Sequence, residues 1–242
     1  MSEASGVRFA ECLPEQPGGP ALQQAALGSD HYLAEEFRFL AAKVAALATG
    51  QCTALGVVSA SPREGKTTVA LGLAAALARS SPHRVLLLEA DLRQPAVESY
   101  LGLPRSAGVA EWLSGSGQTV PIRTVAPPGF AVIAGGRGGL TRPELLGSKR
   151  MGALVGACRL AFGFVVVDLP PLGPTADAVA IQELLDGFLL VVRSRHTARE
   201  DVARAVSRLK PNRIQGLVFN NQPEILPDGY GRYERYGLDT PV

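Results

Sequence analysis

Residues 54–78 read ALGVVSASPREGKTTVALGLAAALA, and this stretch decides the fold. It opens with a short apolar run typical of a buried strand, passes through a polar turn, and continues in small and apolar residues typical of a helix. The turn ends in Gly65-Lys66-Thr67, directly before the expected helix. A strand, a turn of this composition and a helix, in this order, predict a loop that binds nucleotide phosphates, the P-loop.

The chemistry of this loop, residues 59–68, suits a phosphate chain. Its backbone N–H groups and the start of the helix would face the β- and γ-phosphates, and Gly65 would let the backbone approach them closely. Lys66 supplies a point charge, and the Thr67 hydroxyl can bind Mg²⁺. The strict motif has a further glycine where this chain has Ala60. The residues expected around the phosphates are Ser61, Pro62, Arg63, Glu64, Gly65, Lys66, Thr67 and Thr68.

Two further apolar runs end in acidic residues. The run VLLLE ends in Glu89 and is followed by Asp91 and Arg93. Two acids at this spacing on an extended backbone point the same way, toward a ligand at the carboxyl ends of the strands. The alternative is an acidic turn in which Arg93 pairs with Asp91. The run FVVVD ends in Asp168, which fits the Mg²⁺-side carboxylate of a P-loop protein. Its alternative role is to cap the turn before two prolines.

The rest of the chain alternates short β-branched runs with helical stretches. This predicts an α/β fold, a three-layer P-loop NTPase with a mainly parallel central sheet and helices on both faces. We expect a flexible arm over 1–28, a P-loop kinase or ATPase domain over 29–221 and a tail over 222–242. Expected strands lie at 54–59, 85–89, 130–134, 164–168, 188–192 and 217–220, and expected helices at 30–50, 66–78, 143–161, 176–185 and 199–209. Residues 102–128 are expected to form an irregular excursion with one short helix.

Composition limits the remaining possibilities. The chain has 242 residues, 46% of them hydrophobic, which excludes wholesale disorder, and its net charge of +2 gives no reason to expect nucleic acid as a partner. The three cysteines and three histidines are scattered, so no metal site of His and Cys is predicted. No apolar run reaches the roughly 18 residues of a membrane span. We therefore expect a cytoplasmic protein, in which any role at a membrane would depend on a partner.

The chain resembles the bacterial tyrosine kinases (BY-kinases) of capsule and exopolysaccharide synthesis, a branch of the septum-site and partition ATPase group. The likeness covers about residues 32–221 as well as the tail. The motifs that carry it are, in chain order, EEFRFL (35–40), the loop 59–68, EADLR (89–93), GV (108–109), WL (112–113), PELL (143–146), DLPP (168–171), Asp177, Asp186, VVR (191–193), Thr197 and GLVFN (216–220).

The resemblance implies an ATP-dependent protein-tyrosine kinase that uses Mg²⁺ and phosphorylates its own tail. Three of the five tyrosines lie there within seven residues, which makes them candidate phosphoacceptors, Tyr230, Tyr233 and Tyr236. The alternative is a disordered tail with incidental tyrosines. The family also implies a homo-oligomer and, as activator, a separate membrane-anchored polysaccharide co-polymerase or chain-length protein.

The resemblance also assigns roles to single residues. Lys66 and Thr67 would hold phosphate and Mg²⁺, and Asp91 and Asp168 would serve the metal. Glu89, where the family usually has aspartate, would deprotonate the incoming tyrosine, although Asp91 could take that proton instead. Further candidates are Asn220, which matches the family residue that contacts the adenine, and Arg93 and Arg193, which follow or end strands on the ligand side.

The first expected helix resembles the oligomerisation helix of the family. Glu35 and Arg38 match its motif, but Ala41 stands where the family has a second arginine. The alternative is that Glu35 and Arg38, an i,i+3 pair, only stabilise their own helix.

Two rival functions remain open at the level of sequence. The first is a partition-type ATPase, which would activate water rather than a phenol. The second is a catalytically weak nucleotide-binding scaffold in polysaccharide export. The departures Ala60, Glu89 and Ala41 favour this second rival.

Overall fold

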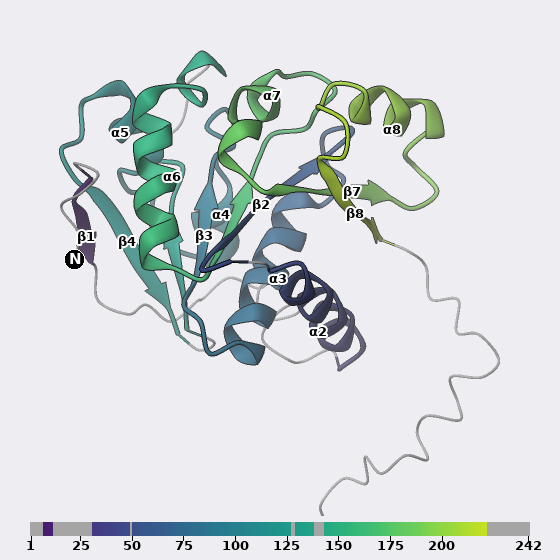
Figure 1. The fold of residues 1–242 in the computed structure, drawn as a ribbon, viewed down its shortest axis with the longest axis horizontal. Helices are drawn as coiled ribbons and strands as arrows, with labels where there is room; N and C mark the ends of the chain where they lie inside the picture. The colour runs from purple at the N-terminus through teal and green to yellow at the C-terminus, as the bar shows by residue number, and fades with distance from the viewer. Residues whose placement is uncertain (1–6, 12–30, 49, 127–128, 138–142, 222–242) are drawn as a thin grey trace, which may run out of the picture.

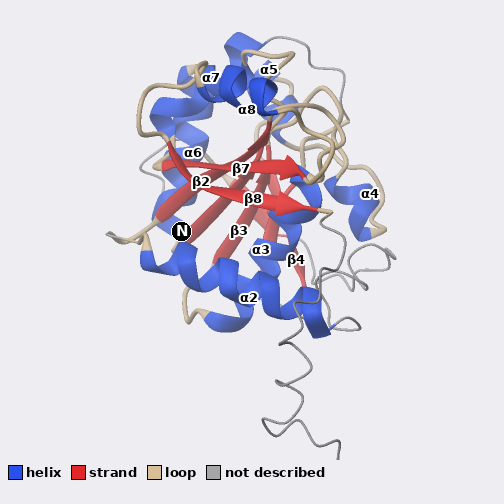
Figure 2. Ribbon diagram, turned by 90° about the vertical axis from the view of Figure 1, so that its right-hand side faces the viewer, coloured by secondary structure: helices blue, strands red, loops and turns tan. Residues whose placement is uncertain are grey.

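A computed structural model describes residues 7–11, 31–48, 50–126, 129–137 and 143–221 of the chain (Figure 1). These residues form one eight-stranded sheet with helices packed on both of its faces (Figure 2). The strands are β1 (Phe9–Glu11), β2 (Thr53–Ser59), β3 (Val85–Glu89), β4 (Val120–Val125), β5 (Phe130–Ile133), β6 (Phe164–Asp168), β7 (Gly187–Arg193) and β8 (Ile214–Asn220).

The helices alternate with the strands along most of the chain. The α-helices are α2 (His31–Ala46), α3 (Lys66–Ser80), α4 (Val97–Leu101), α5 (Val109–Ser114), α6 (Lys149–Ala161), α7 (Asp177–Ile181) and α8 (Arg199–Val206). Two 3₁₀ turns, η1 (Pro143–Leu145) and η2 (Gln182–Leu184), precede α6 and follow α7. Among the described helices, none is both long and apolar enough to cross a lipid bilayer.

The strand order across the sheet is β1-β4-β5-β3-β6-β2-β7-β8. Neighbouring strands run parallel except for the antiparallel pair β4 and β5. The predicted α/β fold, a mainly parallel sheet with helices on both faces, is therefore confirmed. Because β2, β3 and β6 run parallel, the loops that follow them open at the same edge of the sheet. The strand order reverses around β2, and sheets of this kind bind ligands at such a point.

The register of the three central strands brings their ends level. Asp168 at the end of β6 lies opposite Val57 of β2 on one side and Glu89 of β3 on the other. Every residue of β2, β3 and β6 is buried, which explains their nearly continuous Val and Leu composition. The acids that follow these strands therefore leave the sheet at one place.

Helices α2 and α3 cover one face of the sheet (Figure 2). Helix α3 carries small residues because α2 crosses it closely. A Cβ atom on Gly72 would lie 2.2 Å from the nearest atom of the Phe37 ring. Ala41 is fully buried between the same two helices. An arginine at position 41 would therefore have to enter the core between α2 and α3.

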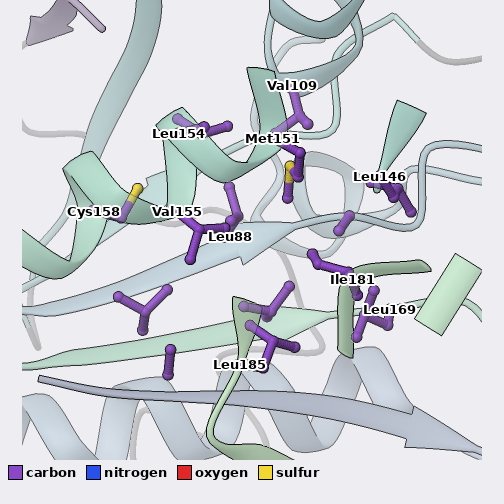
Figure 3. Close-up of a cluster of buried hydrophobic side chains, with 14 of the residues drawn as sticks. Leu88, Val109, Leu146, Met151, Leu154, Val155, Cys158, Leu169, Ile181 and Leu185 are labelled. Carbon is purple, nitrogen blue, oxygen red and sulfur yellow. The ribbon is translucent and has the colours of Figure 1, made fainter. Parts of the chain in front are cut away.

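Helix α6 covers the opposite face, together with α5, α7 and α8. Figure 3 shows Met151, Leu154, Val155 and Cys158 of α6 above Leu88 of β3. Trp112 of α5 is buried against the same helix, and its indole N–H donates to the Arg150 carbonyl at 3.1 Å. Trp112 and Cys158 are buried in this core, and Cys52 is partly buried against it.

Two expected irregular regions contain strands. Within the predicted arm, Phe9–Glu11 forms β1 and pairs with Val120–Ile122 of β4. The predicted excursion 102–128 holds β4 and α5, and the expected helix 143–161 is divided into η1 and α6 by a turn at Gly147. The expectation of a loose arm is therefore wrong for residues 9–11, while the division of the chain into three parts remains a prediction.

Candidate functional site

The loop between β2 and α3 has the backbone of a phosphate cradle. Arg63 and Gly65 have positive φ angles of 63° and 90°, a conformation that turns successive N–H groups toward one side. In the described structure no side chain caps the start of α3 at Gly65, so its first N–H groups remain available for an anion. The predicted strand 54–59 and helix 66–78 correspond to β2 and α3, which begin one residue earlier and end two residues later, respectively.

A buried carboxylate, Glu64, fixes the shape of this loop. Its Oε2 accepts a hydrogen bond from the Ser61 N–H at 3.0 Å, and its Oε1 accepts one from the Thr197 hydroxyl. The Thr197 oxygen in turn accepts the Arg193 N–H at 3.1 Å. The loop is thus tied to the end of β7, and Arg193 contributes to this link through its backbone.

The amide of Asn220 also holds the loop. Its Nδ2 donates to the Glu64 carbonyl at 2.9 Å. A Cβ atom on Gly65 would lie 1.9 Å from the same Nδ2. The adenine contact expected for Asn220 remains a prediction, because in this structure its amide nitrogen contacts the phosphate loop.

Lys66 and Asp91 form a buried ion pair. The Lys66 Nζ lies 2.9 Å from Asp91 Oδ2, and the two side chains are only 16% and 7% exposed. Burial lowers the pKa of Lys66, but the carboxylates of Asp168 and Asp91 outweigh this effect and raise it. The ammonium therefore stays charged at the point where the acidic strand ends meet.

Asp168 lies fully buried beside this pair. Within the described part of the chain, no donor meets the distance and angle of a hydrogen bond to either of its carboxylate oxygens. Burial raises the pKa of Asp168 to about 7, although the Lys66 charge and the Thr67 hydroxyl lower it in part. Two buried carboxylate oxygens next to a hydroxyl fit the ligand set of Mg²⁺, which takes oxygen ligands, commonly one or two carboxylates together with phosphate oxygens and water. Thr67, Asp91 and Asp168 are the residues that would hold it.

Glu89 lies at the end of β3, but its carboxylate faces backbone amides. Its Oε1 accepts the N–H groups of Ala96 and Val97, the latter at 2.8 Å, and its Oε2 accepts the Gly135 N–H at 2.7 Å. The side chain is 1% exposed, and burial raises its pKa in spite of these three hydrogen bonds. Its predicted role as the base remains a prediction.

Arg93 does not pair with Asp91. Its Nε lies 3.1 Å from Asp177 Oδ2, which links the loop after β3 to the start of α7. Asp91 Oδ1 instead accepts the Gln94 N–H at 3.2 Å. The alternative in which Arg93 neutralises Asp91 is therefore wrong, and Asp91 remains paired with Lys66.

Several predicted residues lie elsewhere. Glu35 and Arg38 form an exposed ion pair on α2, and their part in an oligomer contact remains a prediction. Tyr230, Tyr233 and Tyr236 lie outside the described residues.

The bond from Thr197 to Glu64 and the bond from Gly135 to Glu89 were not predicted, because they join residues 133 and 46 positions apart.

Comparison with known proteins places this site in a family. The chain is 31% identical over 186 residues to the tyrosine-protein kinase YwqD of Bacillus subtilis, covering 76% of this chain and 78% of YwqD. It is 34% identical over 181 residues to the succinoglycan biosynthesis transport protein ExoP of Rhizobium meliloti, of which it spans only 23%. No model of a known protein family matches the sequence.

A solved structure agrees with this likeness. The kinase domain of the Escherichia coli tyrosine kinase ETK superposes with a TM-score of 0.74 at 28% identity, covering 87% of this chain and 85% of that domain. Fold, phosphate loop and sequence thus point the same way. Because nearly a third of the aligned residues are identical over most of both chains, this protein belongs to the family of bacterial tyrosine-protein kinases.

Proposed function

We propose that this chain is an ATP-dependent protein-tyrosine kinase that phosphorylates its own tail and regulates the synthesis and export of a capsular or exopolysaccharide. The observation that carries the proposal is the buried group formed by Lys66, Asp91 and Asp168 beside the phosphate loop. Such a group suits a triphosphate with its metal. The names of the relatives, tyrosine kinases and a polysaccharide transport protein, support the acceptor and the process.

The proposed chemistry is an in-line phosphoryl transfer. The phenol oxygen of a tyrosine bonds to the γ-phosphorus while the bond to the leaving ADP oxygen breaks, and the phenol proton passes to the carboxylate of Glu89 or Asp91. The loop amides and Lys66 stabilise the negative charge on the phosphate oxygens. Mg²⁺, when bound through Thr67, Asp91 and Asp168, neutralises further charge on the phosphates.

The test is phosphosite mass spectrometry on the full chain after incubation with Mg²⁺ and ATP. We expect phosphate on Tyr230, Tyr233 or Tyr236, and none in Lys66→Met. Lys210→Met is the matched control, because the Lys210 side chain forms an exposed ion pair with Glu183. It should keep the activity of the unmodified chain.

Two other results would select the rival functions. Release of inorganic phosphate with unmodified tyrosines would identify a partition-type ATPase, because water rather than a phenol would then be the acceptor. Binding of ATP with neither release nor transfer, even beside a membrane partner, would identify a scaffold.

A membrane protein is the proposed activator. ExoP is about four times longer than the part that this chain matches and is named a transport protein. We propose that a membrane-anchored polysaccharide co-polymerase recruits the kinase to the cytoplasmic face of the membrane, where ATP is available, and that the kinase acts as a homo-oligomer. Co-sedimentation with vesicles that carry such a partner, against empty vesicles, tests the recruitment.

A further inference from the structure

The segment from Glu89 to Val97 forms a closed loop that carries Asp91. Glu89 closes it with its own side chain, because Oε1 accepts the N–H groups of Ala96 and Val97 at the far end of the segment. The Ala90 N–H donates to the Asp168 carbonyl at 2.8 Å, which ties the near end to β6. The position of Asp91 therefore depends on where the Glu89 carboxylate is held.

The same carboxylate joins this loop to a second one. Its Oε2 accepts the N–H of Gly135, directly after β5. A Cβ atom on Gly135 would lie 3.1 Å from that oxygen, so the two segments meet closely. Arg105 bridges the same segments from the solvent side, since its guanidinium donates to the carbonyls of Pro95 and Arg137, each at 3.3 Å.

A base must reach the proton that it removes. The Glu89 oxygens already accept three backbone N–H groups, whereas Asp91 Oδ2 lies 2.9 Å from the Lys66 ammonium, where the phosphates would bind. We propose that Glu89 is a positioning residue, which clamps the loops after β3 and β5 and thereby places Asp91, and that Asp91 is the carboxylate of this strand end that faces the reacting groups. This inference rests on the proposed function.

Two substitutions separate the clamp from the base. Glu89→Gln keeps the length of the side chain, and its amide oxygen can still accept the N–H groups of Ala96 and Val97. Glu89→Asp restores the residue usual in the family but withdraws the carboxylate by about 1.5 Å, the length of one carbon–carbon bond, which is enough to break all three hydrogen bonds. A clamp therefore predicts that Gln is the better replacement, and a base predicts that Asp is.

The experiment measures kcat and KM for tail phosphorylation in both variants. We expect Glu89→Gln to keep kcat within about tenfold of the unmodified chain. Glu89→Asp should lose on the order of 10²-fold in kcat, as a misplacement of this size can cause, with KM for ATP nearly unchanged. Asp186→Asn is the matched control. Its carboxylate also accepts a backbone N–H, that of Ala54 at 2.7 Å, but at the opposite end of the sheet, so kcat should not change.

A second readout is independent of activity. Hydrogen exchange of the Ala96, Val97 and Gly135 amides should be at least tenfold faster in Glu89→Asp, and the same three amides should stay protected in Asp186→Asn. If the unmodified chain transfers no phosphate, the proposed function fails and exchange alone decides the role of Glu89.

Three results would overturn the clamp. The first is a Glu89→Asp variant as active as the unmodified chain while Glu89→Gln loses more than tenfold in kcat. The second is unchanged exchange at the three amides in Glu89→Asp. The third applies if Glu89→Asp does not fold. It is a folded Glu89→Gln variant that loses more than tenfold in kcat.

Discussion

Replacing Asp168 by asparagine should stabilise the nucleotide-free protein at neutral and alkaline pH. The carboxyl group is fully buried, and its pKa rises from an ordinary 3.8 to about 7. A carboxyl group whose pKa is raised by folding destabilises the folded state as pH rises from about 4 to about 7, because the unfolded chain then holds the charge at lower cost. Asparagine has a similar shape and never carries that charge.

The magnitude follows from the shift in pKa. Each unit corresponds to about 1.4 kcal/mol, so the difference between about 7 and 3.8 amounts to about 4 kcal/mol at pH 8. At pH 5 most of the native carboxyl groups are protonated, so less than half of this difference remains. For a domain of this size, about 4 kcal/mol raises the melting temperature by roughly 8–16 °C.

The assay is thermal or denaturant unfolding of both proteins at pH 5 and pH 8. We expect Asp168→Asn to be more stable at both pH values, and by clearly more at pH 8. Mg²⁺ and ADP at a hundredfold excess over Kd should reduce the advantage of the variant at pH 8, because the unmodified chain then gains about 2.7 kcal/mol and the variant has lost a metal ligand. A variant less stable than the unmodified chain at pH 8, or a difference independent of pH, would refute the reasoning.

Three further substitutions test the packing around the site. Gly72→Ala should lower the free energy of unfolding by about 1–3 kcal/mol, since its methyl group would overlap the Phe37 ring; urea unfolding measures it. Thr197→Val removes a hydroxyl that donates to the buried Glu64 carboxylate and should cost about 1–3 kcal/mol and weaken ATP binding, as calorimetry would show; unchanged binding would exclude a role in shaping the loop. Gly65→Ala places a side chain at a φ of 90° and should abolish nucleotide binding while the far-UV circular dichroism stays the same.

The central strands could be predicted from the sequence because both of their faces are buried. β3 and β6 have the bounds that their apolar runs predict, Val85–Glu89 and Phe164–Asp168. β4 was not predicted, because it contains Pro121, which favours a turn, and because Arg123 and Thr124 interrupt its apolar residues. The three residues of β1 carry no signal of their own and form a strand only because β4 offers them an edge.

Like the strands, the site could be predicted from the sequence only in part. Acids at the ends of apolar runs predict a group of carboxylates beside the phosphate loop, and the structure brings Asp91 and Asp168 to Lys66. What each carboxylate contacts could not be predicted, because the partners of Glu89 include a backbone amide after β5. The type of a side chain and its position along a strand can be read from the sequence nearby. Its hydrogen-bond partners depend on which strand lies beside it in the fold.

The outermost strand β1 has a consequence for shortened versions of this protein. It covers the free side of β4, where Val120 and Ile122 are now almost fully buried. A protein that began after Glu11 would leave a row of unpaired backbone groups beside apolar side chains, and such an edge readily pairs with another molecule. Self-association of a truncated kinase would then result from the exposed edge of β4 and not from a native assembly. The oligomer size therefore has to be measured with residues 7–11 in place.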